Sequence, residues 1–259
     1  MNRHLLFFIA LCAYSNISMG ACDNSFVEAV RHNLGYMMEQ NQESEFVACK
    51  KFPPSKDMSI FVIAKRQEGT EIDDSETMGD YNLEIALIDN RTTKVLRRAF
   101  FKKRFISDGY RFDGIEIDTA NYAIAPNVRA IGIRANYYID LGFASSQSLS
   151  LFVPSGTTYK EVLSDADMRI SYINTMSSCT NETRDAKRTV SISKEISEGY
   201  FDLIVRESLV DARVLEGPKP EDDCISKTEH QETKIYKLHF NGKNYVIPKE
   251  MSEFDCRIC

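Results

Sequence analysis

The sequence predicts a mainly β protein, an antiparallel β-sandwich-like fold with one N-terminal helix that is stapled by disulfides. Short segments of alternating apolar and polar residues recur from residue 81 onward, with turn residues between them. An apolar stripe of helical spacing stands near the N-terminus, and no alternation of strands and helices follows it. We find no strict internal repeat, so a propeller is the weaker alternative.

The strongest strand pattern lies within residues 115–140. Apolar residues alternate with others along its second half, at Ile131, Ile133, Ala135, Tyr137 and Ile139. This period of two is typical of a half-buried strand, and Pro126-Asn127 supplies a turn before it. Asp118, Arg134 and Asn136 place polar groups between the apolar ones. We interpret the pair as the middle of a sheet in which Gly132 leaves room for a neighbouring group.

An amphipathic helix is predicted for about residues 24–39. Its apolar stripe consists of Phe26, Val27, Val30, Leu34, Met37 and Met38. Asp23 or Asn24 is suited to cap its N-terminus, and the polar residues 40–45 are expected to end it.

Residues 58–64, MSIFVIA, are continuously apolar, which is typical of a central strand covered on both faces. The N-terminal helix is the candidate to cover one face. The acidic stretch 67–80 predicts a long exposed loop.

Further strands and turns follow from the same alternation. The predicted strands are 83–87, 95–101, 149–153, 159–163, 169–173, 190–196 and 201–205. The predicted turns are 89–93, 107–109, 113–114, 154–156 and 198–199, and 216–223 is a proline-rich acidic loop. A closing hairpin is expected from 235–240 and 243–247 around a two-residue Asn241-Gly242 turn.

Residues 1–20 are expected to be a signal peptide. Arg3 and His4 precede the apolar run 5–13, and small residues at Ser18 and Gly20 suit cleavage. The apolar run is shorter than a membrane span, and we expect no transmembrane segment. The rest, 21–259, is expected to form a single mainly β domain in the periplasm or outside the cell.

Six cysteines follow the predicted cleavage site and suit an oxidising compartment: Cys22, Cys49, Cys179, Cys224, Cys256 and Cys259. The simplest pairing joins Cys22 to Cys49, and Cys179 with Cys224 is a further candidate, although other pairings stay open. Met19-Gly20-Ala21-Cys22 also resembles a lipoprotein processing site. A lipid on Cys22 is the weaker alternative because it would leave an odd number of thiols.

The charge balance points away from nucleic acid as a partner. Removing residues 1–20 takes away one Arg and no acid, so the formal charge goes from −6 to −7. One basic stretch interrupts this acidity and carries aromatic residues. It predicts a docking patch for another envelope protein or polymer, formed by Arg97, Arg98, Lys102, Lys103 and Arg104. Charges that merely protect a sheet edge are the alternative.

The sequence contains no catalytic, cofactor-binding or metal-binding motif that we recognise. Cys256 and Cys259 have redox spacing, but no residue follows to form the helix that a reactive first cysteine needs. His32, His230 and His239 have no partner at metal-ligand spacing, and no nucleophile elbow or phosphate loop occurs. The acids at 73–80 match no EF-hand. Spatial triads from distant positions stay invisible to sequence patterns.

Several segments resemble uncharacterised exported bacterial proteins of no named family. They are 49–53, 79–83, 117–122, 129–134 and the closing hairpin with Tyr245. The resemblance implies location and a shared fold, and it assigns no functional residue.

We therefore expect a non-enzymatic binding or interaction module of the envelope, without a cofactor. The alternative is a hydrolase of an envelope polymer that acts through paired carboxylates, since glycosidases need only two acids at the right separation.

Overall fold

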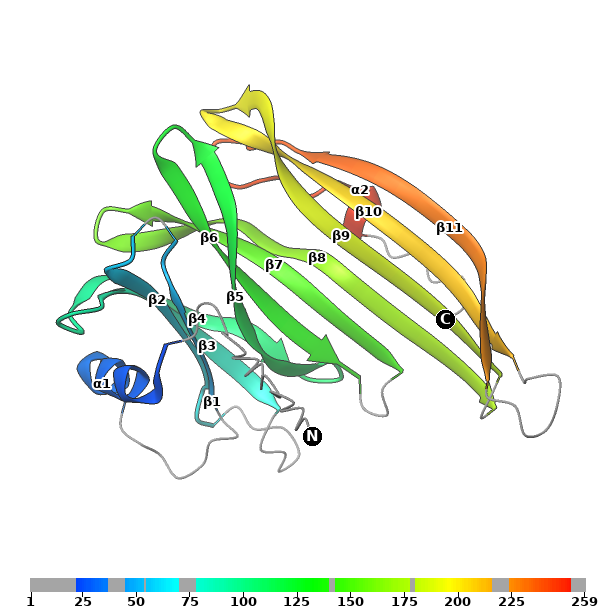
Figure 1. Ribbon diagram of the computed structural model, residues 1–259, viewed down its shortest axis with the longest axis horizontal. Coiled ribbons are helices and arrows are strands. Elements are labelled where there is room, and N and C mark those ends of the chain that lie inside the picture. Colours follow the sequence, from blue (N-terminus) through cyan, green and yellow to red (C-terminus); the bar gives the residue numbers. More distant parts are fainter. Residues whose placement is uncertain are drawn as a thin grey trace, which may run out of the picture.

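The computed structural model describes residues 22–36, 45–53, 55–69, 78–139, 143–177, 180–215 and 224–252. They confirm the mainly β, antiparallel prediction: two sheets with a short helix beside one of them (Figure 1). The small sheet contains, in spatial order, β1 (Glu45–Lys51), β2 (Met58–Arg66), β3 (Gly79–Asp89) and β4 (Val95–Ser107). No helix among the described residues is long and apolar enough to span a membrane.

The large sheet contains seven strands and also follows chain order. They are β5 (Arg111–Ala125), β6 (Val128–Tyr138), β7 (Ala144–Ser155), β8 (Thr158–Ser177), β9 (Thr180–Ser197), β10 (Tyr200–Leu215) and β11 (Ile225–Leu238). Each strand pairs antiparallel with its neighbours in sequence, and a short helix, α2 (Lys249–Ser252), follows β11. In Figure 1 the strands β7 to β11 extend as a curved surface beyond the small sheet.

The helix α1 (Asn24–Leu34) begins where its sequence predicts and ends earlier. The Asp23 carboxylate accepts a hydrogen bond from the Phe26 N–H at 2.8 Å, which confirms Asp23 as the N-cap. The prediction of a helix to residue 39 was wrong, because Gly35 adopts a left-handed conformation with φ 88°. The Tyr36 and Gly35 N–H groups bond back to the carbonyls of Arg31 and His32, a Schellman ending.

The continuous apolar run of β2 is buried on both faces, as predicted. Ile60, Val62 and Ala64 belong to the core between the two sheets. Phe61 and Ile63 point the other way and pack against Val30 and Leu34 of α1. The helix therefore covers the small sheet on the face away from the large one.

Aromatic rings fill the core between the sheets. Phe112 of β5 lies at its centre, with ring centroids 4.9 Å from Tyr81 and 4.7 Å from Phe105. Ile131, Ile133 and Ala135 of β6 belong to the same core, which confirms their alternation. Burial of such rings is the main favourable term for joining the sheets.

A second core lies on the large sheet and its C-terminal extension. Leu149 and Leu151 pack in one cluster with Leu203, Tyr245 and Met251, although these residues come from distant parts of the chain. The Tyr245 hydroxyl donates to the Phe201 carbonyl at 2.7 Å, and its N–H donates to the Val162 carbonyl. The segment after β11 is thus tied across the sheet.

Several predicted strand boundaries were wrong. The segments 159–163 and 169–173 belong to one strand, β8, whose bulges and left-handed Asp165 (φ 49°) break the alternation. Asp113-Gly114 is a bulge inside β5 and not a turn, and β1 was missed. The pair 115–140 forms β5 and β6 at the edge of the large sheet and not its middle.

The closing hairpin was also predicted wrongly. Residues 225–238 form one long edge strand that pairs with β10. Phe240 and Tyr245 form a single isolated bridge around a four-residue turn, so the two-residue turn does not occur. The Asn241 side chain accepts bonds from the Lys243 and Asn244 N–H groups and shapes this turn.

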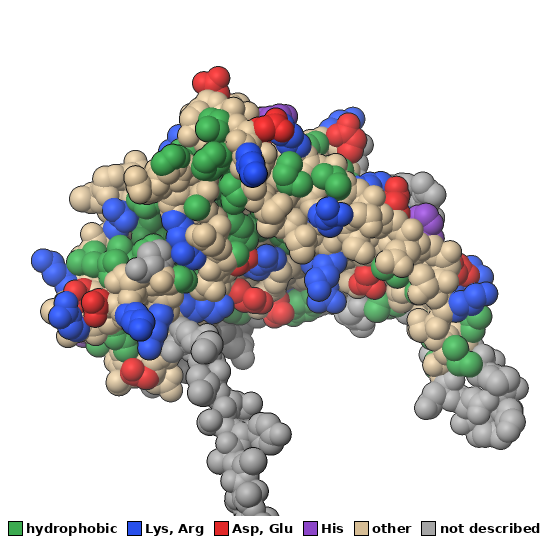
Figure 2. Space-filling view, turned by 45° about the horizontal axis from the view of Figure 1, so that its top comes forward, with side chains coloured by type: hydrophobic (Ala, Val, Ile, Leu, Met, Phe, Trp, Pro, Cys, Tyr) green, Lys and Arg blue, Asp and Glu red, His purple; other side chains and the backbone are tan. Residues whose placement is uncertain are grey.

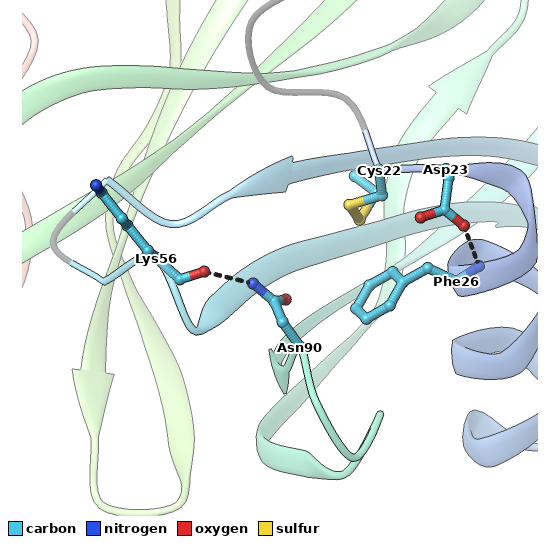
Figure 3. Close-up of a disulfide and its surroundings, with 6 residues drawn as sticks. Cys22, Asp23, Phe26, Lys56 and Asn90 are labelled. Carbon is cyan, nitrogen blue, oxygen red and sulfur yellow. Dashed lines mark hydrogen bonds between the residues drawn. A yellow bond between two sulfur atoms is a disulfide. The ribbon is translucent and has the colours of Figure 1, made fainter.

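The disulfide between Cys22 and Cys49 is confirmed, with 5.5 Å between the Cα atoms (Figure 3). It joins the start of α1 to β1 next to the Asp23 cap. A lipid thioether would need the same Cys22 sulfur, so the disulfide and the lipid are alternatives at this residue. Cys224 is also disulfide-bonded, whereas Cys179, Cys256 and Cys259 lie outside the described residues. So do the predicted signal peptide, residues 70–77 of the acidic loop and the loop 216–223.

Candidate functional site

The five cations of the predicted docking patch all lie on β4, an edge strand of the small sheet. The structure does not leave them equally available. Arg104 is engaged within the protein, and its side chain is only 9% exposed. It bonds to Glu161 at 2.6 Å, to Asp165 at 3.0 Å and to the Ser150 hydroxyl at 2.6 Å. Burial lowers the pKa of Arg104, but the charges of Asp165 and Glu161 outweigh burial and hold it above its usual value.

Arg98 is held by a buried acid. Its guanidinium contacts Glu84 at 2.6 Å and 2.9 Å, and the Glu84 side chain is 1% exposed. The Tyr36 hydroxyl donates to the same carboxylate at 2.7 Å, and Arg98 also donates to the Leu34 carbonyl. Arg98 therefore links β4 to the end of α1.

Of the remaining cations, Lys102 and Lys103 are exposed and Arg97 is partly buried. Lys103 pairs with Asp80 at 2.7 Å and keeps 53% of its side chain exposed. The Nε of Arg97 donates to the Gly156 carbonyl, and its guanidinium lies 5.3 Å from the centre of the Tyr159 ring. Lys102 is exposed and has no ion pair among the described residues.

Large apolar side chains lie beside these cations. Phe100 and Ile106 are each 57% exposed, and Leu96 is 43% exposed. Phe100 is opposite Glu84 and Ile106 is opposite Asp80, so both face the helix side of the small sheet, beyond the cover of α1. We call Leu96, Phe100, Lys102 and Ile106 the β4 surface. Figure 2 shows cations and acids mixed over the face that it presents, with no broad field of one sign there.

A cavity of about 340 Å³ lies where the turn before β5 meets β7 and β8. Its lining combines two phenol rings, serine hydroxyls, two apolar side chains and one acid: Tyr110, Ala144, Ser145, Ser146, Asp167, Ile170, Ser171 and Tyr172. We call it the Asp167 cavity. Sequence patterns missed it because its residues come from three separate segments.

The carboxylate of Asp167 makes no side-chain hydrogen bond with the described residues. Burial raises the pKa of Asp167, Arg188 opposes this and the charge of Asp165 adds to it. Arg188 is engaged elsewhere: it bonds to Glu207 at 2.6 Å and donates to the main-chain carbonyl of Asp167 at 2.9 Å. The acid is therefore partly desolvated without a counter-ion bonded to it.

A serine, a histidine and an aspartate do come together at the turn between β9 and β10. The Nδ1 of His239 lies 3.0 Å from Asp202 and 3.4 Å from the Ser197 hydroxyl. A catalytic triad needs the acid on Nδ1 and the nucleophile on Nε2, so one nitrogen serving both cannot relay a proton. Lys237 contacts Asp202 as well, at 3.4 Å. We interpret the group as a charge cluster that fixes the turn.

The polar groups of the β5–β6 pair form one hydrogen-bonded network. Arg134 bonds to Asp118 at 2.7 Å and to the Gln147 side-chain oxygen at 2.7 Å, and Gln147 donates to Asn136. Burial raises the pKa of Asp118, but bonds from the Ala120 N–H, Tyr122 and Arg134 lower it overall. Every member has a partner, which indicates a structural role.

No cluster of three or more metal-ligating side chains occurs among the residues that the structure describes. The Cys256 and Cys259 pair lies outside that part of the chain.

Comparisons with known proteins add no family. No protein-family model matches the chain, and neither the curated proteins nor the solved structures include a significant match.

Proposed function

We propose that this chain is an exported, non-enzymatic binding module that docks an acidic protein of the cell envelope through the β4 surface. The supporting observation is the exposure of Phe100 and Ile106 beside Lys102 on one edge strand. Exposed aromatic and aliphatic groups next to cations are the composition of protein interfaces, in which apolar anchors supply affinity and charges supply steering.

The choice of an acidic partner follows from charge complementarity. Among the described residues, two acids pair with β4 cations on this side, Glu84 with Arg98 and Asp80 with Lys103. Lys102 has no ion pair there, whereas Arg97 lies opposite Leu87 and contacts Gly156 and Tyr159 on the other face of the strand. The surface is thus locally positive on a chain of formal charge −6. An acidic partner meets attraction here and repulsion over much of the remaining surface.

The disulfide supports export, because such bonds persist in oxidising compartments. Cell fractionation, with the mass of the purified N-terminus, tests both export and cleavage after Gly20. Recovery of the full-length chain from the cytoplasm with a reduced Cys22 contradicts this part of the proposal.

One observation favours the hydrolase alternative. Asp167, whose pKa is raised by burial, lines a cavity, and Asp165 lies two residues away in the chain. An inverting or retaining mechanism needs both acids to face the substrate. Asp165 is bound by Arg104 and does not line the cavity. Among the residues that the structure describes, the cavity therefore offers one acid, and binding is the better-supported function.

The docking test must spare the structural cations. Removing Arg98 strands the buried Glu84, and removing Arg104 breaks its bonds to Glu161 and Asp165, so a loss of binding by either variant would be ambiguous. The informative variant is Phe100→Ser with Lys102→Glu, whose side chains are exposed. A matched control is Ile235→Ser with Lys187→Glu, an exposed apolar residue and an exposed cation on the large sheet.

Both variants and the parent chain are used to capture proteins from an envelope extract, and the captured proteins are identified by mass spectrometry. We expect an acidic protein that the parent and the control retain and that the β4 variant loses. Its capture should weaken as NaCl rises from about 0.1 M to about 1 M, which shortens the Debye length from about 10 Å to about 3 Å. Equal capture by the β4 variant would refute docking at this surface.

A further inference from the structure

We propose that the Asp167 cavity is a binding site for a small ligand that carries a protonated amine on a compact apolar body. This site is separate from the β4 surface, and its existence does not depend on the docking proposed there. Its volume of about 340 Å³ lies within the range of small-molecule sites, roughly 300–1,000 Å³.

The acid of the cavity sets the charge of the ligand. Asp167 has no side-chain hydrogen bond with the described residues, and Arg188, whose charge acts on it, is bonded to Glu207 and to a main-chain carbonyl. A desolvated carboxylate without donors is unfavourable, and an ammonium group supplies up to three donors together with the opposite charge. An anionic ligand would meet repulsion from Asp167.

The rest of the lining suits the same head group. Tyr110 and Tyr172 belong to the lining, and the faces of aromatic rings attract ammonium groups. The Ser146 hydroxyl, on the same strand face as Ile170, can accept an N–H bond that the carboxylate leaves over.

The apolar part of the lining sets the body of the ligand. Ala144 and Ile170 contribute aliphatic surface, and Ala144 is 6% exposed. A ring or short alkyl chain of about the size of a Phe side chain matches this mixture, with its head group against Asp167.

The test uses three probes of nearly equal shape: benzylamine, benzyl alcohol and benzoate. Each is titrated at neutral pH into the isotopically labelled full chain with its disulfides intact, and amide shifts are followed by NMR. We expect saturable shifts at Ser146, Ile170 and Tyr172 with benzylamine, and at least about tenfold weaker binding of benzyl alcohol. Benzoate should produce no shifts at these residues.

Variants distinguish the contribution of the Asp167 charge to binding from that of the space in the cavity. Asp167→Asn should weaken benzylamine at least about tenfold and leave benzyl alcohol unchanged, because only the charge is removed. Asp113→Asn, an exposed acid of β5 outside the lining, is the control and should bind as the parent does. Ala144→Leu should fill the space and reduce the affinity for both probes.

Three results would overturn the proposal. The first is equal affinity for benzylamine and benzyl alcohol in the parent chain. The second is shifts confined to residues outside the lining, and the third is undiminished amine binding by a folded Asp167→Asn variant. The comparison of probes on the parent chain decides the question even if Asp167→Asn does not fold.

Discussion

Arg98 on the edge strand β4 forms a two-point ion pair with Glu84, whose side chain is 1% exposed. The cation is half exposed and the acid is buried, so removing Arg98 and removing Glu84 have different effects on stability. Loss of the arginine leaves a buried carboxylate with only the Tyr36 hydroxyl as a donor.

Arg98→Ala is therefore expected to lower the free energy of unfolding by roughly 2 kcal/mol. Lys102→Ala, on the same strand without an ion pair among the described residues, should change it by no more than about 0.5 kcal/mol. Urea unfolding of both variants measures the difference. Adding Glu84→Gln to Arg98→Ala should recover part of the loss, and an additive cycle would contradict the coupling.

Gly132→Ala is expected to destabilise the β5–β6 pair. A Cβ on Gly132 would lie 2.9 Å from the Asp118 Cβ and 3.0 Å from the Tyr122 ring. The resulting overpacking costs typically about 1–3 kcal/mol. Gly109→Ala is the control, because no atom lies within 4 Å of its added Cβ. Thermal unfolding should give a lower melting temperature for Gly132→Ala than for Gly109→Ala. Equal melting temperatures would show that the β5–β6 pair accommodates the added Cβ at no cost in stability.

Asp202 should contribute to acid unfolding. Burial raises the pKa of Asp202, but bonds from Ser197 and Lys237 together with His239 outweigh burial and lower it overall. Because the folded-state pKa is depressed, the carboxylate stabilises the fold above its unfolded pKa of about 3.9. This stability is lost as the pH falls below that value through the folded pKa.

Unfolding free energies of the parent and Asp202→Asn, measured from neutral pH down to about pH 3, test this expectation. The parent should lose more stability than the variant across the acid range, so the two curves converge. Asp113→Asn should follow the parent. Parallel curves for Asp202→Asn and the parent would show that Asp202 is not the titrating group.

Removing the Cys22–Cys49 bond, with Ser at both positions, should destabilise the chain. The bond closes a separation of 27 residues, which corresponds to about 3.5 kcal/mol in the chain-entropy model. Chemical unfolding gives the magnitude, and hydrogen exchange should show the loss first in α1. Uniform protection changes across the large sheet would contradict a local role for this bond.

Sequence patterns predicted elements in which local and tertiary preferences agree. Asp23 caps α1, residues 58–64 are buried on both faces, and Ile131 to Ala135 alternate as expected. The turn at 89–93 and the pairing of Cys22 with Cys49 are also as predicted. Each depends on residues close in sequence or on a single face of one strand.

The errors have physical causes. Glycine commonly ends helices, but the apolar stripe continues beyond Gly35 and led to a predicted helix that was too long. Bulges such as the one beside Asp165 shift the alternation, so one long strand resembled two short ones. A bulge also explains why the environment of Arg104 was not predicted. Lys103 is left-handed and lies at a bulge, and the Arg104 side chain after it reaches β8.

The candidate sites depended more on the fold than on any motif. The basic stretch was visible, yet the sequence did not distinguish the tied Arg104 from the exposed Lys102. The Asp167 cavity and the Ser197–Asp202–His239 cluster combine residues brought together by strand pairing. No local spacing marks such groups.

The strand order carries a consequence for how the chain is made. Within each sheet, every strand pairs only with the strand before it and the strand after it. A polypeptide that emerges N-terminus first, from a ribosome or through a narrow channel, can add each strand to a finished edge without waiting for a distant segment. Such local pairing favours fast assembly and leaves few unpaired edges waiting for partners. The Tyr245 contacts across the sheet come last and complete the second core.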